Sequence, residues 1–192
     1  MFFILLDELK NIVFNCHKCD LAKTRNNIVF GIGNQNSKIL LVGEGPGQNE
    51  DMTGIPFVGR GGQLLDKMLL EINLSRNKNI YIANMVKCRP PNNRDPLPEE
   101  IDCCINYLRW QFKIIKPKII LCVGRIAAMK IIKKDFSVTR EHGVWFKKKD
   151  IEIMGTFHPA ALLRNPNNLV YAKEDLKILE SKIKEIAPET YF

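Results

Sequence analysis

Residues 43–62 combine glycines, acids and one aromatic side chain in a pattern that suits close contact with a ligand. The stretch is GEGPGQNEDMTGIPFVGRGG; a run of apolar residues precedes it, and apolar residues at helical spacing follow. A strand, a glycine-rich turn and a helix in this order let the backbone approach a bound molecule. A phosphate site fits poorly, because no Lys-Ser/Thr pair follows the glycines and Glu44, Glu50 and Asp51 would repel phosphate oxygens. These acids and Phe57 favour a neutral, flat ligand that forms hydrogen bonds, such as a nucleobase.

Asn84 and His158 are two further side chains with the chemistry to bind a base. Asn84 interrupts an apolar stretch, and a buried amide costs free energy unless it is paired. Its side chain offers one donor group and one acceptor, although a structural amide is the alternative. His158 lies in the segment FHPAALLRNPNN, whereas His17 and His142 lie outside the predicted ligand-binding edge of the fold. A structural histidine is the alternative at this position.

The cysteines indicate metal or redox chemistry rather than disulfides, since the chain looks intracellular. Cys16 and Cys19 form a C-x-x-C pair, Cys88 lies in a proline-rich loop, and Cys103 and Cys104 lie on the next predicted helix. At about 100° per residue, Cys104 falls about 60° from the centre of the apolar face of this helix, and Cys103 falls near the opposite side. Cys104 is therefore predicted as the fourth ligand. Four thiolates can hold zinc or an iron–sulfur cluster, and the spacing favours a cluster without deciding between them.

Composition and charge limit the class of protein. The chain has 192 residues, of which 45% are hydrophobic and 26% charged, and we expect residues 1–192 to form one globular domain. The formal net charge of +8 favours a polyanionic partner such as nucleic acid. The sequence shows neither a membrane-spanning stretch nor a basic leader with a cleavage site, so we expect a cytoplasmic protein that binds no membrane.

Alternating strand and helix patterns predict an α/β fold. This alternation indicates a mainly parallel sheet, in which ligands bind beyond the carboxyl ends of the strands. The glycine-rich stretch and the segments that contain Asn84 and His158 all follow predicted strands, so they should converge on one edge. We expect strands at 38–42, 80–86 and 117–123, a hairpin at 144–146 and 151–154, a short extended piece at 28–30, and helices at 2–14, 61–72, 99–115, 126–133 and from 169 to 186.

Three longer segments resemble the signature motifs of a known family. GEGPGQNEDMTGIPFVGRGGQLLD, YIANMVKCRPPNNRDPLP and FHPAALLRNP resemble those of the family 4 uracil-DNA glycosylases, the iron–sulfur branch of the uracil-DNA glycosylase superfamily. Cys16, Cys19, Cys88 and Cys104 stand where that family places the ligands of a [4Fe–4S] cluster. The resemblance implies a three-layer α/β/α sandwich with a central, mainly parallel four-stranded sheet. It also implies a monomer that excises uracil from single- or double-stranded DNA by hydrolysis, in base excision repair.

The resemblance further implies roles around the base. Phe57 would stack on uracil, and Glu50 would lie at its C5 side. Asn84 would pair with O4 and N3–H, while His158 would face O2, where charge develops as the glycosidic bond breaks. Glu44 and Glu50 are both candidates to orient water or stabilise the cationic sugar. The implied catalytic residues are His158, Glu44 and Asn84, and those that bind uracil are Gly43, Glu44, Gly45, Glu50, Phe57, Asn84 and His158.

Departures from the family pattern are few. Gln48-Asn49 replaces a more acidic pair, and Cys103 is an additional cysteine. A related branch that bonds covalently to abasic DNA has an inserted basic loop containing histidine after the second strand. This chain has CRPPNNR there instead, so ordinary hydrolysis is expected.

Residues near the predicted site loops are candidates to contact DNA. Leu162 or Leu163 could enter the base stack where uracil leaves, as apolar side chains do in kinked DNA, and simple packing is the alternative for both. Four arginines flank the loops and are predicted to contact phosphates: Arg60, Arg89, Arg94 and Arg164.

Two other functions remain open at this stage. A zinc-stabilised module that binds nucleic acid without catalysis would use the same loops for recognition only. A nucleotide- or phosphate-processing enzyme would use the glycine-rich loop, although the missing Lys-Ser/Thr pair argues against it.

Overall fold

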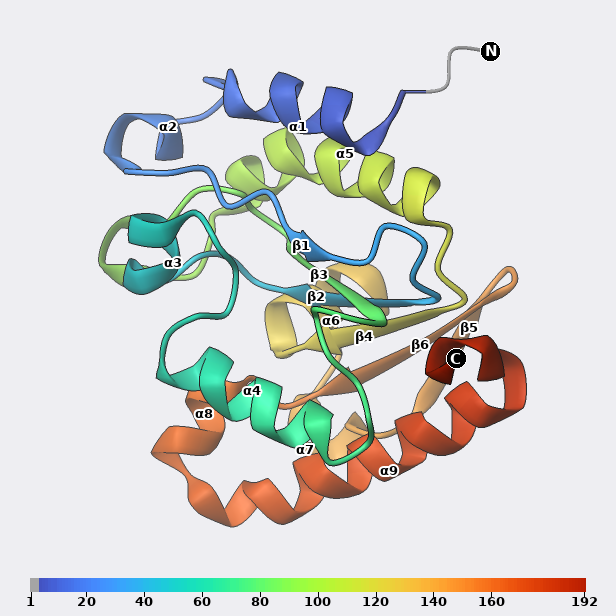
Figure 1. The fold of residues 1–192 in the computed structure, drawn as a ribbon. Coiled ribbons are helices and arrows are strands. Elements are labelled where there is room, and N and C mark those ends of the chain that lie inside the picture. The colour runs from blue at the N-terminus through green and yellow to red at the C-terminus, as the bar shows by residue number, and fades with distance from the viewer. Residues whose placement is uncertain (1–3) are drawn as a thin grey trace.

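A mixed sheet of six strands forms the centre of the computed structural model, which describes residues 4–192. The strand order is β1-β3-β2-β4-β6-β5, and helices cover both faces of the sheet (Figure 1). The strands are β1 (Ile32–Gly33), β2 (Ile39–Gly43), β3 (Ile80–Asn84), β4 (Ile119–Val123), β5 (Trp145–Lys148) and β6 (Ile151–Thr156). The helices are α1 (Leu6–Phe14), α2 (Leu21–Thr24), α3 (Gln48–Thr53), α4 (Arg60–Leu70), α5 (Pro98–Ile115), α6 (Arg125–Ile131), α7 (Val138–Glu141), α8 (Pro159–Arg164) and α9 (Leu169–Ile186), with short 3-10 turns at Pro91–Asn93, Pro166–Asn168 and Pro188–Tyr191.

The four central strands are parallel, because β2 pairs in parallel with β3 and β4, and β4 with β6. Every residue of β2 is buried, as expected for a strand with helices on both sides. Leu40 and Val42 face one core, which includes residues of α1, α5 and α6. Ile39 and Leu41 face the other, with residues of α4 and α9. The predicted α/β/α layers are confirmed.

The predicted count of four strands is wrong, because each edge of the parallel core has an additional short antiparallel strand. β1 pairs with β3, and β5 pairs with β6 as the expected hairpin. β1 spans two residues only, and Gly33 has a φ of 134° with no room for a side chain, since a Cβ there would lie 2.2 Å from the Ile80 carbonyl oxygen. A strand this short with a glycine has no hydrophobic alternation that reveals it.

Four short helices were not predicted. α2 follows the C-x-x-C pair, α3 lies inside the glycine-rich stretch, α7 precedes the hairpin, and α8 lies in the segment expected to be a loop. Each has at most six residues, too few for a recognisable helical period. Within residues 4–192, no helix is both long and apolar enough to cross a membrane.

Candidate active site

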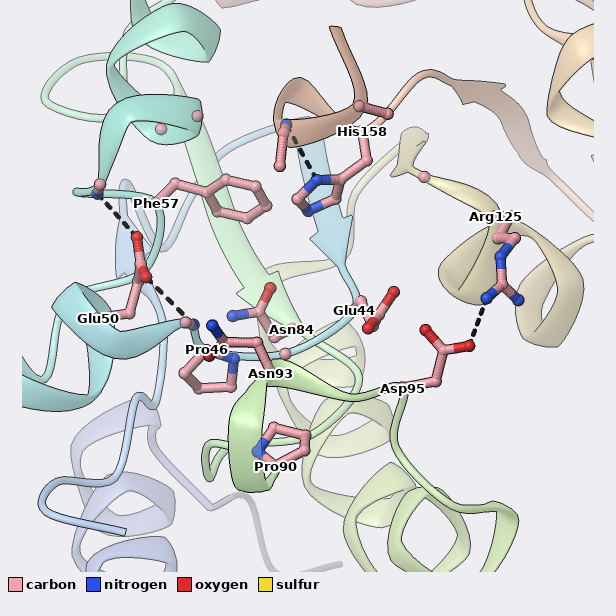
Figure 2. Close-up of a pocket in the computed structure, with 18 of the residues that line it drawn as sticks. Glu44, Pro46, Glu50, Phe57, Asn84, Pro90, Asn93, Asp95, Arg125 and His158 are labelled. Carbon is pink, nitrogen blue, oxygen red and sulfur yellow. Dashed lines mark hydrogen bonds and ion pairs between the residues drawn. The ribbon is translucent and has the colours of Figure 1, made fainter. Parts of the chain in front are cut away.

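The segments that follow the parallel strands enclose a cavity of about 470 Å³. This volume lies within the usual range of small-ligand pockets. The glycine-rich stretch after β2, Asn84 at the end of β3, Gly124 after β4 and His158 after β6 all line it, and Figure 2 shows several of these side chains around a common space. The sheet edge therefore brings together the loops that the sequence predicted to converge.

Asn84 presents an unpaired hydrogen-bonding atom at this cavity. The residue is only 1% exposed, and its Oδ1 is buried without a hydrogen-bond partner among the described residues. Gly43 faces it on the adjacent strand, and a Cβ on Gly43 would lie 2.4 Å from Oδ1. Buried polar atoms are nearly always paired, so an orphan at a cavity wall indicates a position where a ligand supplies the partner.

Phe57 forms an aromatic wall of the cavity from an unusual backbone conformation. Its φ is 54°, a left-handed value that is costly for a residue with a large side chain. Arg76 donates to the Phe57 carbonyl oxygen at 2.9 Å, and Gly62 packs so closely that a Cβ there would lie 1.9 Å from that oxygen. The ring centroids of Phe57 and His158 are 5.9 Å apart. Tertiary contacts thus fix this ring before any ligand is present.

Glu50 holds the same turn from the other side. One carboxylate oxygen accepts the backbone N–H groups of Val58 and Gly59, each at 2.8 Å, and the other accepts the Gly47 N–H at 3.1 Å. Glu50 lines the cavity, as Figure 2 shows, but its charge is already satisfied by three donors. This carboxylate is therefore poorly placed to bind water as well.

His158 faces the cavity as a neutral ring. Its Nδ1 accepts the Ala160 backbone N–H at 3.2 Å, so the proton of the neutral ring lies on Nε2. Burial lowers the His158 pKa to about 4, and the positive charge of Arg164 acts in the same direction. In Figure 2 the second ring nitrogen points into the space above Asn84 and Glu44. The ring can therefore donate a hydrogen bond to a ligand throughout the physiological pH range.

Glu44 is the carboxylate least engaged by the surrounding chain. The Glu44 pKa is raised to about 7, chiefly by burial and next by the negative charge of Asp95, while the positive charge of Arg125 opposes both effects. Asp95 and Arg125 form an ion pair with each other beside Glu44 (Figure 2). Both line the cavity, and neither was among the predicted site residues. Arg125 directly follows Gly124, which comes after the third predicted strand. Because ligands bind beyond the carboxyl ends of parallel strands, its position in the sequence already indicated a place near the site.

The two leucines proposed to enter DNA differ sharply in exposure. Leu162 is 2% exposed and packs in the core that contains α4 and α9, whereas Leu163 is 40% exposed. Packing therefore argues against Leu162 as a residue that enters the base stack. Both lie on α8, and the sequence did not separate them because that segment was expected to be a loop.

The four arginines predicted to contact phosphates also differ. Arg60 and Arg164 are exposed, and Arg164 lines the cavity. Arg89 donates to the Asn93 side chain at 2.8 Å. Arg94 forms two hydrogen bonds, at 2.9 and 2.6 Å, with the nearly buried carboxylate of Glu100. Arg94 is therefore committed to a structural ion pair.

The cysteines surround a second, smaller cavity between α1, α2, α5 and the loop after β3. Cys16, Cys19, Cys88 and Cys104 line it, and so does Cys103. Cys88 and Cys104 are buried, whereas Cys103 is partly exposed. Within residues 4–192, no three or more His, Cys, Asp or Glu side chains are arranged as a metal-binding group.

The donor set nevertheless fits an iron–sulfur cluster or a zinc ion. The four predicted sulfurs converge from three separate segments on one cavity that has almost no polar surface of its own. Arg25 donates to the Cys88 sulfur and the Lys87 backbone N–H donates to the Cys104 sulfur, each at 3.3 Å. Donors of this kind orient and stabilise ligating thiolates.

Comparison with known proteins identifies clear relatives. A family model described as the uracil DNA glycosylase superfamily matches residues 30–180. The chain is 45% identical over 196 residues to a type-4 uracil-DNA glycosylase of Sulfurisphaera tokodaii, covering 97% of this chain and 87% of that protein. It is 42% identical over 182 residues to one of Archaeoglobus fulgidus, covering 90% of each, and 42% identical over 187 residues to one of Thermotoga maritima, covering 94% of this chain and 96% of that protein.

Proposed function

Since the chain belongs to the uracil DNA glycosylase superfamily, we propose that it hydrolyses the N-glycosidic bond of uracil in DNA and releases free uracil. The observation that best supports this activity is the unpaired Asn84 amide at the base of a cavity that has an aromatic wall. Uracil offers an acceptor at O4 and a donor at N3–H on adjacent positions. A single amide in one orientation satisfies both.

The cavity accounts for recognition of a flipped base. Uracil in a duplex is stacked, so it must leave the helix and find compensating contacts in the protein. Phe57 supplies the stacking face, and its backbone is already held in place by Arg76 and Glu50. We place Glu50 beside C5, where the methyl group of thymine would be excluded, and Gly43 and Gly45 against the base, where side chains would fill the space.

His158 and Glu44 are the groups we assign to bond cleavage. As the bond to the sugar breaks, negative charge grows on uracil O2, and the Nε2–H of neutral His158 donates to it. Glu44 stabilises the cationic sugar or orients the attacking water. We rank Glu44 above Glu50 for this role, because the Glu50 carboxylate already accepts three backbone N–H groups.

Leu163 is the residue we propose to occupy the gap that the flipped base leaves. It is exposed and lies on α8, which begins directly after His158. Arg60 and Arg164 lie nearby at the start of α4 and the end of α8, where they can contact phosphates on this side of the cavity.

We propose that Cys16, Cys19, Cys88 and Cys104 hold a [4Fe–4S] cluster. The convergence of these four thiols and the similarity to type-4 relatives support this assignment. When bound, the cluster would serve as a structural cross-link between the N-terminal segment and α5. The protein residues would orient it through Arg25 and the Lys87 backbone.

Three further properties are part of the proposal. One sheet takes strands from most of the chain, which supports a single domain that works as a monomer. None of the six cysteines, which all lie within residues 4–192, forms a disulfide, and this suits a reducing, cytoplasmic environment. The open cavity edge and a formal net charge of +8 are compatible with both single- and double-stranded uracil-containing DNA.

Incubation with a labelled oligonucleotide that contains one uracil tests the activity. We expect an alkali-labile abasic site and free uracil with the unmodified protein, and a much smaller yield with Leu163→Ala on duplex DNA than on single strands, where no stack must be opened. An absorption spectrum of the purified protein separates a cluster, which is coloured, from zinc. Normal DNA binding without any abasic product would instead support a non-catalytic binding module.

A further inference from the structure

Arg125 stands at the side of the cavity opposite Phe57 and Glu50, paired with Asp95 (Figure 2). The two residues come from different segments, since Arg125 begins α6 and Asp95 lies in the loop between β3 and α5. Building on the proposed function, we infer that Arg125 binds a DNA phosphate beside the flipped nucleotide, and that Asp95 occupies the position of this phosphate in the free protein.

The Asp95–Arg125 pair is exposed enough to exchange partners. The side chains are 53% and 52% exposed, and ion pairs between exposed side chains contribute little to stability. Within residues 4–192, the Arg125 guanidinium hydrogen-bonds only to Asp95. A phosphate with two free oxygens can replace that carboxylate, because a guanidinium binds either anion through the same planar fork.

Arg94, which also lines the cavity, cannot make the same exchange. Arg94 binds both oxygens of Glu100, whose side chain is only 5% exposed. Removing Arg94 from this carboxylate would leave a nearly buried charge without its partner, which is strongly destabilising. Within residues 4–192, Arg125 is therefore the arginine lining this side of the cavity that DNA can recruit.

The charges around the cavity explain why such a cation is needed. Glu44, Glu50 and Asp95 all line the opening and oppose the approach of a polyanion. A flipped nucleotide brings its own phosphates to the cavity mouth. Arg164 and Arg60 lie on the α8 and α4 side, so Arg125 would hold the backbone on the other side.

Salt-dependent binding tests this inference. The probe is a fluorescein-labelled duplex containing one 2′-fluoro-deoxyuridine, which resists excision, and Kd is measured by anisotropy at several salt concentrations. We expect Arg125→Gln to bind about 5- to 10-fold more weakly at low salt and to lower the slope of log Kd against log salt by about 1. Asp95→Asn should bind several-fold more tightly, because the competing anion is gone. Arg125→Lys should have nearly the same slope of log Kd against log salt as the unmodified protein, since it keeps the positive charge.

Arg109→Gln is the matched control, because it removes one exposed arginine from α5, outside this cavity. The inference is overturned if Arg125→Gln has the same slope as Arg109→Gln, or if Asp95→Asn weakens binding as much as Arg125→Gln, as a purely structural pair would require. Thermal melting of each variant identifies misfolding. An excision assay on the unmodified protein tests the proposed activity separately. A lack of excision would refute that activity, while the salt dependence of Kd in the variants would still show whether Arg125 binds a phosphate.

Discussion

Asn84 offers the sharpest test of base recognition, through the variants Asn84→Ala and Asn84→Asp. The Asn84 Oδ1 is buried and has no hydrogen-bond partner within residues 4–192, and in the proposed function the bound base supplies that partner. Asn84→Ala would remove two hydrogen bonds to uracil, each contributing about 0.5–1.5 kcal/mol, which amounts to about 5- to 150-fold in excision rate. Asn84→Asp would also place an acceptor against uracil O4, so we expect a loss of about 30- to 1,000-fold.

Excision of cytosine should rise relative to excision of uracil in Asn84→Asp. The N4–H₂ group of cytosine donates where uracil O4 accepts, so an amide that fits uracil faces cytosine donor to donor. Asn84→Asp provides an acceptor at that position and should narrow or invert the preference for uracil, whereas Asn84→Ala should gain no cytosine activity. Single-turnover excision on matched uracil and cytosine oligonucleotides measures both rates.

Asn79 provides the control for a structural amide. It is also buried, but its Oδ1 accepts the Ser75 N–H at 2.9 Å and its Nδ2 donates to two backbone carbonyls. Asn79→Ala should lower the melting temperature and leave the ratio of uracil to cytosine excision unchanged. Asn84→Ala should change the ratio of uracil to cytosine excision and leave the melting temperature nearly unchanged. Near-normal uracil rates in both Asn84 variants would refute the assignment and leave Asn84 as a structural amide.

Three further predictions concern the proposed cluster, the exclusion of thymine from the cavity and the dependence of excision on pH. Cys104→Ala should lose iron and lower the melting temperature, whereas Cys103→Ala should keep its iron and an unchanged melting temperature. Iron content and thermal melting measure these effects, and the reverse result would contradict the assignment of Cys104 as the ligand. Glu50→Ala should raise thymine excision relative to uracil excision, because space opens near C5. Uracil excision itself should fall, because three backbone N–H groups lose their acceptor. An unchanged ratio of thymine to uracil excision would mean that another residue excludes the thymine methyl group. Excision should rise with pH through about 7, because the Glu44 pKa is raised to about 7 and its carboxylate forms above that value, and Glu44→Gln should flatten this rise. His158 has a pKa lowered to about 4 and stays neutral from pH 5 upward, so an inflection near 6.5 that disappears in His158→Asn would contradict its role as a neutral donor.

The parallel core and the location of the site followed from sequence pattern. Residues 80–86 are mostly apolar with little alternation, which predicts a strand buried on both faces, and the structure confirms it, since every residue of β3 is buried. Because parallel strands end at a common edge, the sequence alone places Asn84 and His158 near the glycine-rich stretch. The edge strand β1 and the four shortest helices were missed because their stability comes from neighbours rather than from their own periodicity.

Contacts between distant segments account for what the sequence did not reveal. Arg76 supports the carbonyl group of Phe57 from 19 positions away, and no local pattern indicates that pairing. The choice between Leu162 and Leu163 required the orientation of α8, and the ion pair of Asp95 with Arg125 required the approach of two loops. Such pairings depend on tertiary geometry that a single sequence does not encode locally.

The cavity formed by the cysteines has a consequence for the order of events during synthesis. Cys19 and Cys104 line the same cavity, yet roughly 85 residues separate them along the chain. At roughly 5–20 residues per second, a ribosome takes about 4 to 17 s to synthesise this interval. Cys16 and Cys19 therefore leave the ribosome well before α5 exists to receive them, and α1 has no helix to pack against during that time. Closure of this cavity is a late, long-range step in maturation, and assembly of the proposed cluster would have to wait for the middle of the chain.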